Sequence, residues 1–201
     1  MIFRKINLIS YPIFCLLLFF LSGCGVGKST VMTNDSKTKD VHLIAVLPVQ
    51  NGTSDQQAAA MLRDKVLNAL YFKGYPRIPA QLIDEKLSVQ QQKENPEDKV
   101  EYSRVLGEQM HVDAVLYCDL KESRTTRYLF YSPMSVAAVF ELRSAKTGQL
   151  LWRNSYSSIR RNYGISKNSL RLKISQDYES AIQELVDKGI ESLPESPDIL
   201  G

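Results

Sequence analysis

The sequence predicts a single three-layer α/β domain, in which a mixed sheet with a carboxyl-terminal antiparallel hairpin is flanked by helices. Two observations carry this prediction. Strongly apolar stretches at residues 41–49 and 112–120 enclose helix-forming segments, an order typical of parallel strands in an α/β unit. Residues 134–143 and 150–156 then alternate apolar and polar side chains on either side of a glycine turn, which predicts the hairpin.

The first strand and the first helix of the domain have clear signals. Residues 41–49 are apolar on both faces, as in a central strand, and Pro48 is expected to mark the exit from it. A turn at Asn51 follows, after which Ser54 and Gln57 resemble a capping box. The helix opened there has an apolar stripe made of Ala59, Leu62, Val66, Ala69 and Leu70.

The middle of the chain alternates helical segments with breaks. Residues 77–79 leave room only for a short strand, and residues 81–90 predict a second helix. A polar break at residues 91–96 precedes a third helix at residues 97–110. Residues 112–120 then form the second strong strand.

The carboxyl-terminal half completes the domain. The hairpin turns at Lys146-Thr147-Gly148, and apolar residues at helical spacing from about Ser169 to Leu193 predict an amphipathic helix that packs on the sheet. About 155 ordered residues can bury a full core, and no internal repeat appears. We therefore expect one domain at residues 41–193, followed by a short tail at residues 194–201.

The first 23 residues have the features of a targeting segment and are not expected to belong to the fold. Arg4 and Lys5 give a positive start, and residues 11–21 form an almost uninterrupted apolar run. The run has about half of the roughly 20 residues needed to cross a bilayer, so a signal peptide fits better than a permanent transmembrane helix.

The apolar run ends in Leu21-Ser22-Gly23-Cys24, which resembles the lipobox of bacterial lipoproteins. The resemblance implies cleavage before Cys24, a diacylglycerol thioether on its sulfur, and a palmitate-type acyl group on its new amino terminus. Several acyl chains hold a protein on a membrane firmly, whereas one gives only marginal binding. The alternative is an ordinary secretory signal peptide with an incidental cysteine. Residues 24–40 are small and polar, which predicts a flexible tether with a span of about 22 Å.

Charge and cysteine content narrow the function classes. Removing residues 1–23 takes away two of 25 basic side chains and none of 22 acidic ones, which leaves a net charge of about +1 and no electrostatic argument for nucleic acid. Cys15 leaves with the signal peptide and Cys24 carries lipid, so no intramolecular disulfide can form. Cys118 lies in an apolar strand, where a buried small hydrophobe is expected.

Residues 23–30 look like a phosphate-binding loop, whose glycines let backbone amides surround a phosphate. The first glycine of that motif would fall at position 22, which is Ser22, and the preceding apolar run is the signal peptide. Residues 31–40 also lack the pattern of the helix that must follow. We therefore predict no nucleotide site.

Candidate catalytic groups are few. The mature chain holds His42, His111 and Cys118, without a metal-ligand cluster or a recognisable catalytic motif. We expect both histidines to be structural, and we predict no catalytic site, no metal site and no cofactor. Carboxylates distant in sequence can still meet in space, so an enzyme remains the less favoured alternative.

One group of side chains on either side of the hairpin has the composition of a binding surface, because Tyr and Arg are the usual anchors of protein interfaces. The alternative is a solvated sheet edge with ordinary core aromatics. The predicted surface comprises Arg124, Arg127, Tyr128, Tyr131, Arg160, Arg161 and Tyr163.

Residues 46–51, 74–76, 113–117 and 147–152 together resemble a family of uncharacterised Gram-negative lipoproteins that includes a meningococcal surface antigen candidate. The resemblance implies a fold similar to the amino-terminal domain of TolB and to the periplasmic domains of CsgG and LpoB, and a CsgG-like lipoprotein as partner. A CsgG-type pore needs more membrane-inserting hairpins than the one evident here, and LpoB-type activation needs a longer tether. By itself this chain is expected to do neither.

Together these features predict a lipid-anchored, non-enzymatic module that helps assemble an envelope or secretion complex. Gly25 stands where an aspartate would favour inner-membrane retention, by resemblance to enteric sorting signals, so the outer membrane is expected, with the domain in the periplasm. The alternative function is a peptidoglycan- or glycan-binding or glycan-processing lipoprotein.

Overall fold

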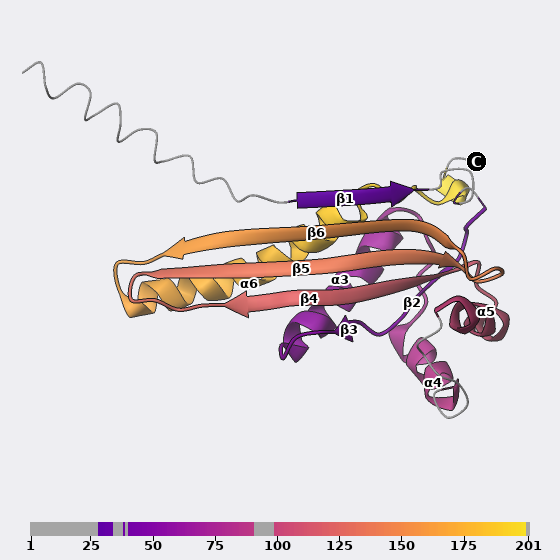
Figure 1. Ribbon diagram of the computed structural model, residues 1–201, viewed down its shortest axis with the longest axis horizontal. Coiled ribbons are helices and arrows are strands. Elements are labelled where there is room, and N and C mark those ends of the chain that lie inside the picture. Colours follow the sequence, from indigo (N-terminus) through magenta and orange to yellow (C-terminus); the bar gives the residue numbers. More distant parts are fainter. Residues whose placement is uncertain (1–27, 34–37, 39, 91–98, 200–201) are drawn as a thin grey trace, which may run out of the picture.

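The computed structural model describes residues 28–33, 38, 40–90 and 99–199 (Figure 1). The strands are β1 (Lys28–Thr33), β2 (Ile44–Val46), β3 (Gln50–Asn51), β4 (Ala114–Thr125), β5 (Tyr131–Ser144) and β6 (Leu150–Tyr163). The helices are α3 (Gln56–Phe72), α4 (Ala80–Gln90), α5 (Lys99–Met110), α6 (Lys167–Ile190) and a short 3₁₀ helix at Pro197–Ile199.

The strands form one mixed sheet in the order β1-β6-β5-β4-β2, with β3 also paired to β4. β2 and β3 run parallel to β4, whereas the β4–β5, β5–β6 and β1–β6 pairs are antiparallel. The predicted mixed sheet flanked by helices, with a hairpin near its carboxyl end, is therefore confirmed.

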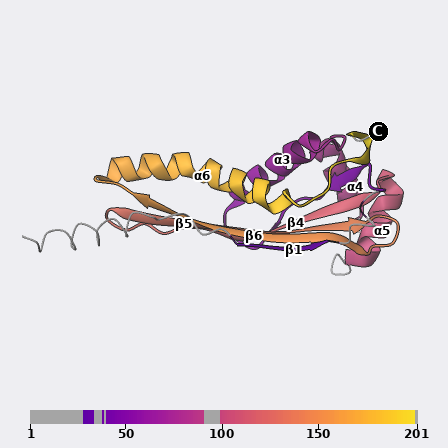
Figure 2. The ribbon, with the colours of Figure 1, turned by 90° about the horizontal axis from the view of Figure 1, so that it is seen from above.

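Helices cover the two faces of the sheet unequally (Figure 2). α3 and α6 pack on one face, which we call the inner face, and enclose the main core with Leu116, Phe140 and Trp152. α4 and α5 lie at one end of the opposite, outer face and form a second cluster with Val115. The rest of the outer face has no helical layer among the described residues. None of the described helices is both long and apolar enough to cross a membrane.

The first predicted strand is too long. The β2 ladder with β4 ends at Val46, although the Leu47 N–H still donates to the Leu116 carbonyl at 3.1 Å, and pairing resumes at Gln50, beyond Pro48. His42 therefore precedes the strand instead of lying in it. Residues 77–79 do not form a strand, and α4 begins immediately after them.

The helix-opening signal was also misplaced, because Asp55, and not Ser54, caps α3. The Asp55 carboxylate accepts a hydrogen bond from the Ala58 N–H at 2.9 Å. The same carboxylate accepts bonds from the Tyr178 hydroxyl at 2.6 Å and the Ser123 hydroxyl at 2.8 Å. One side chain thus ties α3 to α6 and β4.

The predicted flexible tether is wrong for residues 28–33. These residues form β1, which pairs antiparallel with β6 from Lys28 opposite Ser157 to Thr33 opposite Trp152. β1 covers part of an edge that would otherwise present unpaired N–H and C=O groups. Lys28 therefore begins a strand instead of opening a helix, which agrees with the rejection of a phosphate-binding loop.

Strands β4, β5 and β6 are longer than the sequence predicted. β4 continues to Thr125 and pairs with β5, so the chain has a second hairpin in addition to β5–β6. A bulge between Leu120 and Glu122 shifts the alternation of β4, since Leu120 lies in the core before the bulge and Ser123 bonds Asp55 after it.

The carboxyl end of α6 lies directly on β5 and β6. Gly189 faces Phe140 so closely that a Cβ atom at position 189 would lie 2.2 Å from the Phe140 ring. The Asn154 side-chain amide donates to the carbonyl oxygens of Lys188 and Gly189, at 3.2 and 2.7 Å. Trp152 Nε1 donates to the Ser192 hydroxyl at 3.1 Å, just beyond the helix.

We expect Gly189→Ala to destabilise the domain by about 1–3 kcal/mol, because overpacking this contact outweighs the better helix propensity of alanine. Urea denaturation followed by circular dichroism measures the change. Lys173→Ala, an exposed position of the same helix, is the control and should leave stability nearly unchanged. Equal stability of both variants would show that α6 does not depend on this close approach.

Candidate interaction surfaces

The structure gathers most of the predicted binding residues at one end of the sheet, which we call the hairpin end (residues 124–131 and 161–166). Arg124 lies near the end of β4, and Arg127 and Tyr128 lie in the β4–β5 connection. Tyr131 begins β5 and is paired with Tyr163 at the end of β6. This end lies far from α4 and α5 (Figure 1).

Three tyrosines stack in a row at the hairpin end. The ring centroids of Tyr128 and Tyr131 lie 5.9 Å apart, and those of Tyr131 and Tyr163 lie 4.9 Å apart. The Tyr128 N–H donates to the Tyr131 carbonyl at 2.8 Å, which fixes the connection that presents them. Such contacts order the rings although Tyr128 and Tyr163 remain more than half exposed.

Arg160 does not join this group. Its side chain lies on the inner face, where it donates to the Glu184 carboxylate of α6 at 2.6 Å. Tyr156 and Ser158 donate to the other oxygen of Glu184, at 2.8 and 3.2 Å. Burial opposes ionisation of Glu184, but these donors and the Arg160 charge outweigh it, so the pKa of Glu184 lies below its ordinary value. Arg160 therefore holds α6 on β6.

Leu129 and Phe130, which lie between the predicted Tyr128 and Tyr131, are also exposed at the hairpin end, and so is Ile165, which was not predicted. Residues 128–131 form an uninterrupted run of large apolar and aromatic side chains between two strands. A hollow of about 210 Å³ opens between this run and α6. It is lined by Arg127, Tyr128, Leu129, Lys167, Leu170, Arg171 and Ile174.

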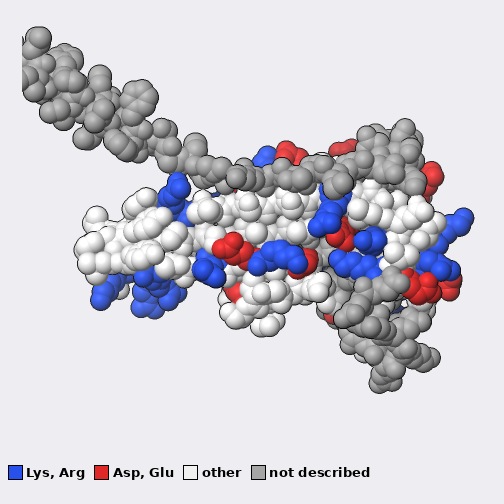
Figure 3. All heavy atoms as spheres, in the orientation of Figure 1, with Lys and Arg blue, Asp and Glu red and all other residues white. Residues whose placement is uncertain are grey.

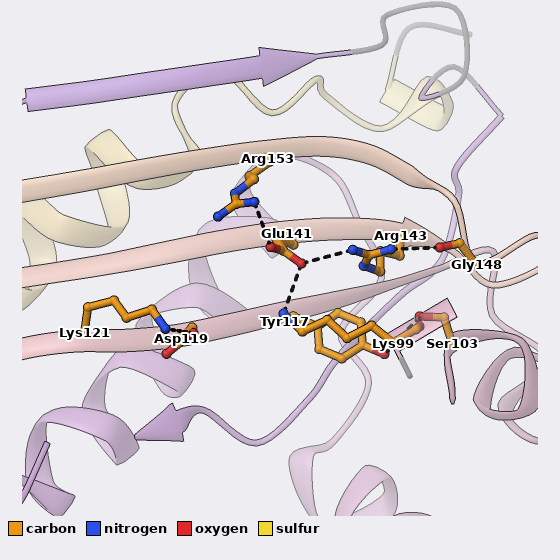
Figure 4. Close-up of polar contacts among 9 residues, drawn as sticks. All are labelled: Lys99, Ser103, Tyr117, Asp119, Lys121, Glu141, Arg143, Gly148 and Arg153. Carbon is orange, nitrogen blue, oxygen red and sulfur yellow. Dashed lines mark hydrogen bonds and ion pairs between the residues drawn. The ribbon is translucent and has the colours of Figure 1, made fainter. Parts of the chain in front are cut away.

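A second surface lies on the outer face, around the carboxylate of Glu141 (Figure 4). Glu141 is 7% exposed, and its oxygens lie 3.1 Å from Lys99 Nζ, 3.4 Å from an Arg153 nitrogen and 3.5 Å from an Arg143 nitrogen. Burial opposes ionisation of Glu141, but the hydrogen bond from Lys99 and the nearby positive charges prevail. The pKa of Glu141 is therefore below its ordinary value.

Three further contacts connect the groups around this carboxylate to neighbouring elements. Lys99 Nζ lies 5.2 Å from the centroid of the Tyr117 ring, and the Tyr117 hydroxyl lies 2.9 Å from the Ser103 hydroxyl of α5. Arg143 donates to the Gly148 carbonyl in the β5–β6 turn at 3.1 Å. The network of Lys99, Glu141, Arg143 and Arg153 thus joins α5, β5, β6 and a turn, and it carries more positive than negative charge.

Between this network and the hairpin end, β5 and β6 present an uncharged strip on the outer face, seen as the white band in Figure 3, and β4 beside it carries Asp119, Lys121 and Glu122. We call the strip the open sheet face. Its side chains are small or apolar and are paired directly across β5 and β6. They are Ser135, Ala137, Val139, Ser155, Ser157 and Ile159.

The candidate catalytic residues are not brought together. His42 Nδ1 lies 2.9 Å from the Asp198 carboxylate in an exposed pair, and His111 is in the turn between α5 and β4. Cys118 is buried as predicted, and burial raises the pKa of its thiol to about 12. No three His, Cys, Asp or Glu side chains in the described part of the chain are arranged to hold a metal ion. The lipobox residues Leu21, Ser22, Gly23 and Cys24 lie outside the described residues.

The sequence matches a family model described as "Putative lipoprotein GNA1162-like" over residues 33–193. Because the match covers most of the chain, the protein belongs to this lipoprotein family, and the resemblance inferred from its sequence motifs is confirmed. No curated protein matches the chain.

The chain is similar to several solved structures, of which lipoprotein GNA1162 supports the fold. Lipoprotein GNA1162 from Neisseria meningitidis is 22% identical, with a TM-score of 0.50 over 68% of this chain and 95% of its own. The subunit of the PelC dodecamer from Paraburkholderia phytofirmans is 16% identical, with a TM-score of 0.49 over 81% and 96%. The LpoB carboxyl-terminal domain from Escherichia coli is 17% identical, with a TM-score of 0.41 over 71% and 92%.

We expect Glu141→Gln to lower stability at neutral pH by about 1–3 kcal/mol, because it removes the charge that holds three cations together. A carboxyl whose folded-state pKa is lowered stabilises the fold above its unfolded-state pKa of about 4.3 and loses that contribution as the pH falls. The stability difference between the native protein and the variant should therefore shrink on acidification.

Urea midpoints at pH 7 and below pH 4.3 measure this difference. The control is Glu191→Gln, which removes a carboxylate from an exposed ion pair with Lys188 and should change stability little. A difference between the native protein and Glu141→Gln that is the same at both pH values would contradict the role assigned to the charge.

Proposed function

We propose that this protein is a lipid-anchored, non-enzymatic module of an envelope or secretion complex, held at the outer membrane with its domain in the periplasm. Membership of a lipoprotein family and the lipobox at Leu21 to Cys24 support the anchor. Gly25 supports the outer membrane, because it stands where, by resemblance to enteric sorting signals, an aspartate would favour inner-membrane retention.

The observation that carries the interaction role is the open sheet face. An antiparallel sheet can leave one face to water, but such a face usually carries polar side chains. The uncovered strip of β5 and β6 instead has small or apolar ones, which let a flat partner surface approach the strands closely. Ala137 and Ser157 face each other at the centre of this area. The Glu141 network beside it, with Arg153 about half exposed, favours a partner that presents carboxylates.

The surroundings of the candidate nucleophile, Cys118, and of the candidate base His42 support a non-enzymatic role. A thiol with a pKa of about 12 in the core has little thiolate at neutral pH, and the His42 ring contacts the Asp198 carboxylate in an exposed pair instead of a nucleophile. A CsgG-like lipoprotein is the partner class that the resemblance to this family implies. The protein would then act by holding that partner close to the membrane.

Replacing the lipid-bearing cysteine should release the protein from the membrane. We expect the native chain to incorporate labelled palmitate and to fractionate with the outer membrane, whereas Cys24→Ser does neither, because it lacks the sulfur that accepts diacylglycerol. Cys15→Ser, in the segment removed by cleavage, is the matched control and should behave as native. A palmitate-labelled Cys24→Ser chain would exclude the proposed anchor.

A bulky charge at the centre of the open sheet face should abolish association with the partner. We expect crosslinked pull-down from membranes, read by mass spectrometry, to recover the same envelope protein with the native chain and with Ser180→Arg on exposed α6, but not with Ala137→Arg. Recovery by all three chains would exclude this face. Turnover of an envelope substrate by the purified protein would contradict the non-enzymatic role, and binding to isolated sacculi would favour the glycan-binding alternative.

A further inference from the structure

We propose that the hairpin end is a membrane-docking surface, which places its apolar side chains among the headgroups of an anionic bilayer. The inference deepens the proposed function, because the membrane concerned is the one that holds the lipid anchor. It assigns a lipid partner to the predicted tyrosine–arginine surface and leaves the open sheet face to a protein.

The tip of the surface exposes large apolar side chains whose contact with water is unfavourable. Tyr128, Leu129 and Phe130 are 60%, 61% and 56% exposed, and Ile165 in the neighbouring β6–α6 connection is 95% exposed. Aromatic rings with a polar tip, flanked by aliphatic side chains, are the residues that sit at a membrane–water interface. Contiguous apolar exposure of this kind marks a contact site.

The hollow behind the tip is lined by both apolar and basic side chains. Leu129, Leu170 and Ile174 give it apolar walls, and Arg127, Lys167 and Arg171 stand around it. An apolar space of about 210 Å³ with cations at its rim suits part of an acyl chain beneath an anionic headgroup. A protein side chain could fill the space but would not need several cations around it.

Charge at this end has one sign. Residues 123–140 and 154–176 contain no aspartate or glutamate. Arg124, Arg127 and Arg161 are exposed, and none forms an ion pair with another described residue. Figure 3 shows only blue charged side chains among the white ones at the left end. Basic side chains beside exposed aromatic and aliphatic ones are the signature of an interfacial surface that prefers anionic lipid.

The direction of β1 brings the anchor and the hairpin end to the same side. β1 begins opposite Ser157 and runs away from the hairpin end (Figure 1). Covalent geometry keeps Cys24 within about 14 Å of Lys28, four residues later. Tyr163 lies six residues beyond Ser157 along β6, or about 20 Å. Because about 14 Å is shorter than about 20 Å, Cys24 and the hairpin end contact one bilayer together when the strands are inclined toward its surface.

The test uses the lipidated protein reconstituted into vesicles that contain brominated phosphatidylglycerol, with brominated phosphatidylcholine vesicles as the neutral comparison. Phe130→Trp places a fluorophore at the tip. Phe72→Trp is the matched control, since Phe72 is 84% exposed at the end of α3, beside the carboxyl end of α6. Trp152 is fully buried and gives a constant background, measured in the native chain.

We expect bromine to quench the added emission of Phe130→Trp about twofold or more in the anionic vesicles and to leave Phe72→Trp unchanged. Arg127→Gln combined with Arg171→Gln should reduce that quenching in anionic vesicles and have no effect in neutral ones. Raising the salt concentration should act like the double substitution, because it screens the same charges.

Flotation with the vesicles reports the anchor, and quenching reports docking, so the two proposals fail separately. A chain that floats while Phe130→Trp and Phe72→Trp are quenched equally overturns docking and leaves the anchor intact. A blue-shifted Phe130→Trp without lipid quenching also overturns it, since a protein contact then covers the tip. A native chain that incorporates no labelled palmitate overturns the anchor, and if that chain still floats with anionic vesicles and is quenched at position 130, docking is supported.

Discussion

The position of α6 on the sheet depends on one close contact, the approach of Gly189 to the Phe140 ring. The 24 residues of α6 make a helix about 36 Å long. Because its backbone lies close to the sheet at Gly189, the helix can follow β5 and β6 along their length. The hydrogen bonds from Asn154 hold the same turn. Five residues earlier in the helix, the ion pair of Arg160 and Glu184 adds a polar attachment to β6.

In this arrangement the inner face of the sheet packs in the core, whereas the described helices leave most of the outer face uncovered. The inner face takes the large side chains, whereas the outer face between the Glu141 network and the hairpin end has small ones. Glu141 is the exception, because a carboxylate this poorly exposed is tolerated only with several cations around it. One of those cations, Lys99, belongs to α5, so its ion pair with Glu141 fastens that helix to β5.

Local patterns in the sequence predicted the mixed sheet, the β5–β6 hairpin and the helices, because each depends on the spacing of apolar residues. The spacing of apolar residues did not predict where the strands end. Past Leu120 a bulge shifts the alternation of β4, and toward Tyr163 strand β6 carries serines and arginines. Asp55 was missed as a cap because Ser54 beside it gives an equally good local pattern.

The candidate surfaces were predictable in composition but not in orientation. Arg160 and Arg161 look equivalent in the sequence, yet strand alternation sends the first to Glu184 and the second outward. The partner of Arg160 lies 24 positions away, on an element whose position only the fold determines. The Glu141 network is assembled from α5, β5 and β6 in the same way, and no local spacing indicates it.

The pairing of β1 with β6 has a mechanical consequence. A load applied to the amino-terminal end of β1 acts along the strand axis, and the hydrogen bonds of an antiparallel pair lie across that axis. Such a load shears the whole ladder at once, whereas a load across the strand would peel its bonds one by one. A protein pulled through its amino terminus by a moving bilayer would therefore resist detachment of β1 with the combined strength of six residue pairs.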